Sequence, residues 1–469
     1  MESVEFLERG KQLMNYIIDY FDTVDQRKTL PDVEPGYMKS LIPEEAPQKA
    51  DEWKNVFGDL EKIIMPGITH WQSPHFHAFY PSGTCYASIL AEMLSNSLSC
   101  VGFSWASSPA CTELEFAMMD WLAKMLQLPE EFLSTGEGGG VIQGTASEST
   151  FLMLLAARSK ALSKHINSSK SIKKLVVYTS DQAHSSVERA CLLAAVEYRS
   201  VPSNENEEMT GEALEEMIQK DIDNGLIPFY VVATLGTTPS CAFDRLLEVG
   251  PVCKKHDIWL HIDAAYAGSS FICPEFRPLL DGVEFADSFN FNPHKWLLVT
   301  FDCSTLWLKN KKYLVESFNV DRIYLESKEK EKLLDYRNWQ IPLGRRFRSL
   351  KIWFVLRLMG INNLQSYIRK HVELAKEFEN LVRSSEKFEI THPVTMGIVC
   401  FRLKGDDQLT KNLHDALYKD KRIYLIAGAS KSRYYLRFVV CSQRTTSDDI
   451  NYAWKVINEL SMTSLRERL

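Results

Sequence analysis

Short apolar segments alternate with helical patterns through the middle of this 469-residue chain, from about residue 81. Five segments have the length and the β-branched or aromatic content of strands: 175–178, 229–234, 258–262, 288–291 and 304–308. Amphipathic helical patterns, such as 211–221 and 245–255, lie between them. This alternation predicts an α/β fold in which a mainly parallel central sheet carries helices on both faces. Ligands of such sheets bind beyond the carboxyl ends of the strands, so the residues after each strand belong to one crevice.

Several polar residues fall in this crevice. Residues 136–140 contain four glycines, and Thr145, Ala146 and Ser147 follow at the start of a long helical pattern, where N–H groups and hydroxyls suit a phosphate. A plain glycine-rich loop would have the same composition. His184 follows the strand at 175–178, where an imidazole is able to stack on an aromatic cofactor, although a single histidine is more often structural. Thr238 offers a hydroxyl after the strand at 229–234.

Asp263 directly follows the strand at 258–262. A carboxylate there is costly unless a cation or several donors pair with it, and a protonated pyridine nitrogen is such a cation. The small side chain of Ala265 leaves room for a ring. An aspartate that keeps a pyridine nitrogen protonated makes the ring an electron sink.

Lys295 lies between two strand patterns, with His294 and Trp296 beside it. Lysine is almost never buried without a partner, and burial lowers its pKa, as an amine nucleophile requires. The ordinary alternative is a lysine that extends from a strand end into solvent. Phosphate donors, an imidazole, a carboxylate and an amine in one crevice decide against that alternative. Together they predict a site for pyridoxal phosphate (PLP), with Lys295 as the lysine that forms the Schiff base.

Six stretches resemble one protein family: 108–115, 138–147, 181–189, 261–268, 288–296 and 339–348. The family is the group II PLP-dependent amino-acid decarboxylases of fold type I, and the whole chain is most similar to their animal aromatic L-amino acid (DOPA) decarboxylase branch. The resemblance implies an aspartate aminotransferase-like fold, PLP as the cofactor, an aromatic amino acid as the substrate, and a homodimer.

The resemblance also assigns roles to residues. Catalytic roles are implied for Lys295, His184, Asp263 and Tyr324. Cofactor contacts are implied for Thr145, Ala146, Ser147, His184, Thr238, Asp263, Ala265, Asn292, His294 and Lys295. The walls of the substrate pocket, partly contributed across the dimer, are implied to be Trp71, Phe79, Tyr80, Pro81, Ser82, Val101, Phe103 and Gly344.

Tyr324 stands in a segment with many Lys and Glu residues, which is usually only a solvated face. In the family the corresponding segment is a mobile lid that carries a catalytic tyrosine, and Tyr324 matches that tyrosine. The resemblance implies that Tyr324, working with His184, donates the proton that the α-carbon receives after carbon dioxide leaves.

The flanking regions suggest three domains: an N-terminal helical dimerisation segment (1–80), a large PLP-binding domain (81–350) and a small α+β C-terminal domain (351–469). The N-terminal segment begins with an amphipathic helix, has four prolines between residues 31 and 47 that predict an extended connector, and continues with a helix at about 51–64. Its apolar stripe packs either on a partner subunit, as in the family, or on the chain's own large domain. The C-terminal region has strand patterns at 396–403 and 434–441 and a helical pattern at 448–460.

Composition limits the partners and the compartment. A net charge of −7 and a pI near 6.0 argue against nucleic-acid or anionic-membrane partners. No apolar run reaches spanning length, and the first twenty residues lack a signal-peptide pattern. Ten cysteines, without a Cys-x-x-Cys pair or a His cluster at metal spacing, predict reduced thiols, a cytoplasmic location and no metal site.

These observations predict a carboxy-lyase that converts aromatic L-amino acids, such as DOPA, 5-hydroxytryptophan or tyrosine, to the amine and carbon dioxide. An aminotransferase and an inactive homologue are disfavoured by the complete set of matching motifs. A histidine decarboxylase is disfavoured by Gly344, where those enzymes typically carry serine. An aromatic aldehyde synthase, which also uses O2, stays an alternative because the order Phe79-Tyr80 resembles the insect synthases, whereas His184 does not. We expect amine as the main product, with a measurable stream of aldehyde.

Overall fold

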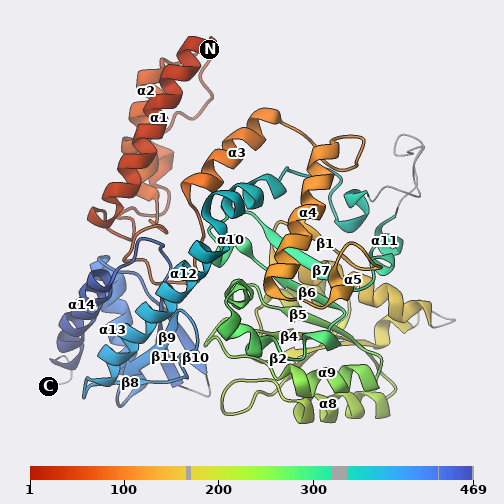
Figure 1. The fold of residues 1–469 in the computed structure, drawn as a ribbon. Helices are drawn as coiled ribbons and strands as arrows, with labels where there is room; N and C mark the ends of the chain where they lie inside the picture. The colour runs from red at the N-terminus through yellow and green to blue at the C-terminus, as the bar shows by residue number, and fades with distance from the viewer. Residues whose placement is uncertain (165–170, 320–334, 431–432, 467–469) are drawn as a thin grey trace. The chain divides into compact units, whose positions relative to one another are not determined.

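The computed structural model describes residues 1–469 apart from 165–170, 320–334, 431–432 and 467–469 (Figure 1). The chain forms two compact units. Ser82–Lys370 is called the large unit below, and Met1–Pro81 together with His371–Leu469 is called the small unit. The sequence-based domain boundaries at residues 80 and 350 stay a prediction.

The large unit is built on a seven-stranded sheet. Its strands are β1 (Gly139–Gln143), β2 (Leu175–Ser180), β3 (Glu197–Val201), β4 (Ile227–Thr234), β5 (Trp259–Asp263), β6 (Ser288–Phe291) and β7 (Ser304–Leu308), in the order β1-β7-β6-β5-β4-β2-β3. Strand β7 is antiparallel to both its neighbours, and the other neighbouring pairs are parallel. Every residue of β2, β5 and β6 is buried. Because successive side chains point to opposite faces, both faces of the sheet are covered, and the predicted mainly parallel α/β fold is confirmed.

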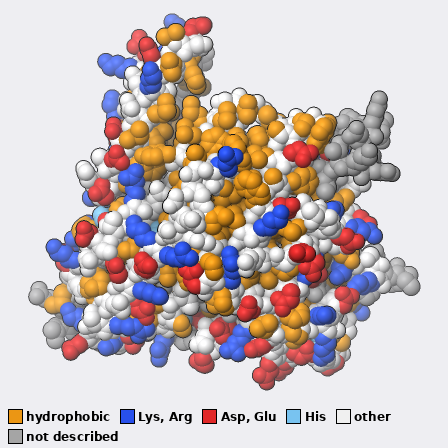
Figure 2. Space-filling model, in the orientation of Figure 1, with side chains coloured by type: hydrophobic (Ala, Val, Ile, Leu, Met, Phe, Trp, Pro, Cys, Tyr) orange, Lys and Arg blue, Asp and Glu red, His pale blue; other side chains and the backbone are white. Residues whose placement is uncertain are grey.

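The helices of the large unit are α3 (Tyr86–Leu98), α4 (Pro109–Leu126), α5 (Ala146–Ser163), α7 (Ser186–Ala194), α8 (Gly211–Asp223), α9 (Leu246–Lys255), α10 (Pro293–Trp296), α11 (Lys312–Phe318) and the first part of α12 (Ser349–Arg383). Helices α5 and α7 join strands β2 and β4 in one buried apolar cluster. Helix α3 instead keeps apolar side chains exposed, and Figure 2 shows hydrophobic side chains gathered over it. They include Tyr86, Leu90, Met93, Leu94 and Leu98.

The sequence patterns did not indicate β1 or β3. Strand β1 has the composition of a glycine-rich loop, but a Cβ on Gly140 would lie 2.7 Å from the indole nitrogen of Trp307. Close packing of β1 on β7 therefore requires glycine at that position. Strand β3 lies at the sheet edge and has four residues that are exposed or half-buried, so it lacks the apolar run by which strands are recognised.

The small unit contains a four-stranded antiparallel sheet in the order β10-β11-β9-β8. Its elements are β8 (Phe388–Ile390), β9 (Ile398–Leu403), α13 (Asp407–Asp420), β10 (Ile426–Ser430), β11 (Arg433–Val439), α14 (Ser447–Arg466) and the last part of α12. Apolar side chains from this sheet and its helices, among them Phe378, Phe401 and Leu413, form a second buried cluster. The expected strands at 396–403 and 434–441 and the helix at 448–460 are present as β9, β11 and α14.

The N-terminal part of the small unit is a pair of helices, α1 (Ser3–Thr23) and α2 (Trp53–Asp59). The Tyr16 ring contacts Phe57 with centroids 5.7 Å apart, and the Tyr16 hydroxyl donates to Glu61 at 2.7 Å. No residue of α1 is buried, although the helix is amphipathic. The expected extended connector contains a 3-10 turn at Tyr37–Ser40, which was not predicted. None of the helices described for this chain has the length and apolar content needed to span a membrane.

Candidate active site

Lys295 lies in a single helical turn that directly follows β6. Asn292 precedes this turn, α10, and the Lys295 N–H donates to the Asn292 carbonyl at 2.9 Å. Pro293 occupies the first helical position, where its fixed φ suits a helix. Trp296 is fully buried and stacks on Tyr266, with centroids 4.7 Å apart. The backbone around Lys295 is therefore anchored on both sides, while the Lys295 side chain is only half-buried.

Asp263 is the last residue of β5 and is 4% exposed. Its Oδ1 accepts a hydrogen bond from the Ala265 N–H at 3.0 Å. Burying a carboxylate is costly unless cations or several donors stabilise it, and the N–H of a pyridinium ring would be such a donor.

His184 follows β2, and its Nδ1 faces two donors on Ser186. The Ser186 N–H donates to Nδ1 at 3.1 Å, and the Ser186 Oγ lies 2.8 Å from the same atom. A backbone N–H only donates, so Nδ1 is an acceptor and the proton of the neutral ring sits on Nε2. Burial lowers the pKa of His184, and the charge of Lys295 lowers it further, against the opposing effect of Asp263. His184 is therefore neutral with an Nε2–H, in the electrostatic field of both Asp263 and Lys295.

The first turn of α5 has the features of an anion-binding site. Thr145 caps this helix, because its Oγ1 accepts a hydrogen bond from the Glu148 N–H at 3.2 Å. The N–H groups of Ala146 and Ser147 have no acceptor among the described residues. Free N–H groups and the positive end of the helix dipole favour a phosphate there.

His294 and Asn292 lie close to that turn. The His294 Nδ1 accepts a hydrogen bond from the Cys303 N–H at 2.8 Å, which leaves the neutral ring with an Nε2–H. Burial, and then the charge of Lys295, lowers the pKa of His294 to about 3. Ser304, next to Cys303, has its Oγ 3.3 Å from the Oγ of Ser149 in the first turn of α5. The side chain of Asn292 is 3% exposed, and its Oδ1 has no hydrogen-bond partner among the described residues.

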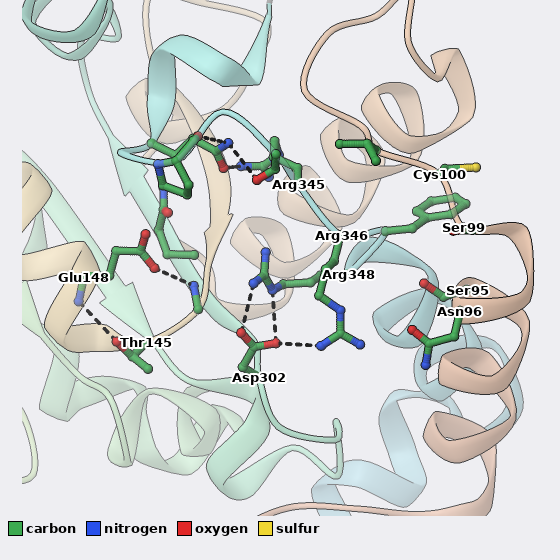
Figure 3. A pocket seen from close by; sticks show the side chains of 17 residues that line it. Ser95, Asn96, Ser99, Cys100, Thr145, Glu148, Asp302, Arg345, Arg346 and Arg348 are labelled. Carbon is green, nitrogen blue, oxygen red and sulfur yellow. Dashed lines mark hydrogen bonds and ion pairs between the residues drawn. The ribbon is translucent and has the colours of Figure 1, made fainter. Parts of the chain in front are cut away.

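A cavity of about 580 Å³ opens beside the start of α5 (Figure 3). Its lining includes Thr145, Val101 and Gly344 of the predicted site, but not Lys295, His184 or Asp263. Asp302 lies between two guanidinium groups in this cavity, those of Arg348 at 2.9 Å and Arg346 at 3.4 Å. The cavity is thus a charged space next to the predicted cofactor site rather than the site itself.

Val101 and Gly344 are brought together, because a Cβ on Gly344 would lie 3.6 Å from Cγ1 of Val101. The Phe103 carbonyl accepts a hydrogen bond from the Arg337 N–H at 3.0 Å, and the Gly102 N–H donates to the Arg345 carbonyl at 3.0 Å, so the segments that carry Phe103 and Gly344 are held together. Ser82 also belongs to the large unit, whereas the remaining predicted wall residues lie in the small unit. Those residues are Trp71, Phe79, Tyr80 and Pro81.

Of the two remaining predicted residues, the structure describes Thr238 but not Tyr324. Thr238 lies in the turn after β4, next to Thr237. Tyr324 and the expected lid lie outside the described residues. Sequence reasoning missed Ser186, and its only signal was a hydroxyl two positions after the candidate histidine. It also missed the buried ion pair of Arg345 with Glu115, which anchors the segment that carries Gly344.

The residues present fit PLP. The start of α5 and the Nε2–H of His294 offer donors to a phosphate, Asp263 offers a buried carboxylate to a ring nitrogen, and Lys295 offers an amine to an aldehyde. Across the described ranges, no group of three or more His, Cys, Asp or Glu side chains could hold a metal ion. The individual roles of these residues stay predictions.

Two proteins with curated functions are similar to the chain over almost its whole length. The aromatic-L-amino-acid decarboxylase of Rattus norvegicus is 55% identical, covering 99% of each chain. The aromatic-L-amino-acid decarboxylase of Drosophila melanogaster is 53% identical over 98% of this chain and 91% of that protein.

Solved structures agree in fold. Oryza sativa TDC with PLP and tryptamine has a TM-score of 0.97 and 36% identity, and Rhodiola rosea 4-hydroxyphenylacetaldehyde synthase has a TM-score of 0.94 and 37% identity. Each comparison covers 99% of both chains. A family model, the pyridoxal-dependent decarboxylase conserved domain, matches residues 35–404. The predicted cofactor and family are therefore confirmed, and the chain belongs to the pyridoxal-dependent decarboxylase family.

Proposed function

We propose that this protein decarboxylates aromatic L-amino acids with PLP, releasing the amine and carbon dioxide. The observation that carries the proposal is the buried Asp263 carboxylate, which shares an electrostatic environment with His184 and Lys295. The near full-length similarity to aromatic-L-amino-acid decarboxylases supports the aromatic substrate class.

When bound, PLP supplies a pyridinium ring that accepts the electron pair left on the α-carbon as carbon dioxide departs. Asp263 would hold the proton on the ring nitrogen, because a cationic donor stabilises a buried carboxylate. The first turn of α5 and His294 hold the phosphate, and Lys295 is the amine that meets the aldehyde. Burial excludes water around Asp263 and strengthens its interaction with the ring nitrogen.

Protonation of the α-carbon completes the reaction. The Nε2–H of His184 is directed by the two Ser186 donors on Nδ1, so His184 holds a proton that is able to move toward the α-carbon. Tyr324 is the second proposed donor, by resemblance to the catalytic lid tyrosine of the family. Fast protonation favours amine over reaction with O2.

The alternative product is an aldehyde. The curated relatives are decarboxylases and do not favour an aldehyde synthase. The test is to incubate the pure enzyme separately with DOPA, 5-hydroxytryptophan, tyrosine and tryptophan, and to measure carbon dioxide, amine, aldehyde, peroxide and O2 together. We expect about one amine per carbon dioxide with the preferred substrate. His184→Asn should shift the product strongly to aldehyde, because a tenfold change in the ratio of amine to aldehyde needs a difference of only about 1.4 kcal/mol between the two barriers. Consumption of one O2 per carbon dioxide without any amine would replace this proposal by the synthase.

A homodimer is part of the proposal. Helix α1 has no buried residue, and α3 exposes five apolar side chains on the large unit. Exposed apolar surfaces of this kind mark subunit contacts. Sedimentation of the active enzyme should give twice the chain mass, and an active monomer would contradict the dimer.

A cytoplasmic location is also proposed. All ten cysteines are free thiols, the state that a reducing compartment maintains. Fractionation of cells that express the protein should place it with cytosolic markers, and recovery with secreted proteins would contradict this location.

A further inference from the structure

Arg437 on β11 is a buried cation without a carboxylate partner. It is 4% exposed, and no ion pair joins it to any carboxylate in the described part of the small unit. Its Nε has no hydrogen-bond partner among the described residues. The guanidinium instead donates from Nη2 to the Phe79 carbonyl at 3.3 Å, and lies 5.1 Å from the centroid of the Tyr80 ring.

A second buried arginine on the same sheet provides the comparison. Arg402 on β9 is also 4% exposed, but it has Asp407 at 3.0 Å and Glu389 at 3.5 Å. Burying a guanidinium without such partners is unfavourable, and a ring face together with one carbonyl offsets this only in part. The position of Arg437 therefore calls for an explanation other than core stability.

Phe79, whose carbonyl Arg437 holds, has an uncommon backbone conformation. Its φ is 55°, in the left-handed region that a bulky residue rarely adopts. The neighbouring backbone is tied to the same sheet, because the His77 carbonyl accepts from the Val439 N–H at 3.1 Å and the Ala78 carbonyl accepts from Cys441 at 3.5 Å. Arg437 adds the contact at Phe79 itself.

The left-handed turn separates two adjacent aromatic rings. Phe79 is 42% exposed and stacks on Trp71, with centroids 5.3 Å apart and planes 14° apart. Tyr80 is only 8% exposed and lies against Arg437. The ring that the turn presents is therefore Phe79, and Tyr80 is the ring that the guanidinium contacts.

We propose that Arg437 is a positioning residue for substrate specificity: it holds Phe79 in the left-handed conformation and so fixes the stacked pair of Phe79 and Trp71. The inference rests on the proposed function and on the predicted place of Phe79 and Trp71 in the wall of the substrate pocket. Without the guanidinium, Phe79 relaxes to a negative φ and its ring leaves Trp71. Substrate binding then weakens, whereas the chemistry at Lys295 continues.

The test is a double-mutant cycle on the holoenzyme with the best aromatic substrate. We expect Arg437→Met to raise KM about tenfold while kcat changes less than about threefold, and Phe79→Ala to do the same. If Arg437 acts through Phe79, the double variant has the KM of either single variant. The proposal would be overturned by a KM raised about a hundredfold in the double variant, as expected for two independent effects, or by an unchanged KM in Arg437→Met.

Arg402→Met is the matched control, because it removes an equally buried arginine from the same sheet. It should lower the melting temperature while KM stays at the wild-type value. Amide hydrogen exchange of the peptide around residues 76–80 should accelerate in Arg437→Met and not in Arg402→Met, and equal exchange in both would overturn the proposal. Should Arg437→Met fail to fold, Arg437→Lys is measured instead, and its KM and hydrogen exchange should change in the same directions but by less. A wild-type enzyme that makes no amine from any aromatic amino acid would refute the proposed function, whereas an active enzyme with an unchanged KM in Arg437→Met refutes only this inference.

Discussion

The two sheets of this protein differ in where their polar residues gather. In the large unit, polar side chains gather after parallel strands: Asp263 and Asn292 are both buried, and the Asn292 Oδ1 has no described partner. In the small unit, the buried Arg402 has carboxylates beside it while the buried Arg437 has none among the described residues, and apolar side chains fill the cluster between the sheet and its helices. Parallel strands all end at one edge, so the residues that follow them converge, whereas antiparallel strands end at alternating edges. The parallel sheet therefore brings reactive side chains together at one edge, whereas the antiparallel sheet has no edge at which all of its strands end.

Of the variants in the large unit, Lys295→Ala should have the largest effect on activity. The variant should lose all turnover, because the described segments that follow the other parallel strands contain no second lysine before the next helix. Borohydride should no longer attach the cofactor to the protein, while Lys312→Ala, a change at an exposed lysine, should behave as wild type. A variant that still traps the cofactor covalently would show that another lysine has this role.

Asp263→Asn should lower kcat without lowering the melting temperature. Loss of the carboxylate should reduce kcat by about 100-fold or more, equivalent to about 2.7 kcal/mol of barrier. The melting temperature of the PLP-free protein should stay the same or rise, since the variant removes a buried charge. A near wild-type kcat would exclude Asp263 as the partner of the ring nitrogen.

Leu413→Ala should show the opposite behaviour in the small unit. Leu413 is fully buried in the apolar cluster there, so its truncation should lower the free energy of unfolding by about 2–5 kcal/mol. The kcat of the folded enzyme should stay unchanged, and Tyr418→Ala on the exposed side of α13 serves as the control. Urea unfolding and steady-state kinetics measure the two effects, and a loss of kcat without a loss of stability would contradict the division.

Near neutral pH, the smallest effect is the pH dependence of the stability of the small unit. Burial lowers the pKa of His77 to about 3, so the folded state holds this ring neutral while the unfolded chain protonates it near pH 6.5. His77 therefore contributes stability that is complete above about pH 6.5 and is lost as the pH falls toward about 3, by about 1.4 kcal/mol per pH unit. In His77→Gln, the free energy of unfolding should fall less steeply than in wild type below about pH 6.5. Parallel slopes in urea unfolding would show that His77 titrates in the folded state.

Much of the fold was predictable because its signals are local. The buried strands β2, β4, β5, β6 and β7 are apolar runs, and each was placed within two residues of its observed bounds. The edge strand β3 has little apolar content, and β1 resembles a loop because Gly140 is required by contact with Trp307, a residue distant in sequence. Strands whose composition is set by a remote neighbour carry no local signal.

Sequence patterns were enough to predict the strand and helix order, the gathering of polar residues after parallel strands, and the PLP chemistry, because each of these signals lies in a short stretch of the chain. The folded structure was needed to show which nitrogen of His184 carries its proton, since that depends on the orientation of the ring against Ser186. It alone placed the first 81 residues in one unit with the C-terminal sheet. It also joined Arg437 to the carbonyl of Phe79, 358 positions away. A hydrogen bond needs direction and distance, and across such a separation only the folded chain supplies both.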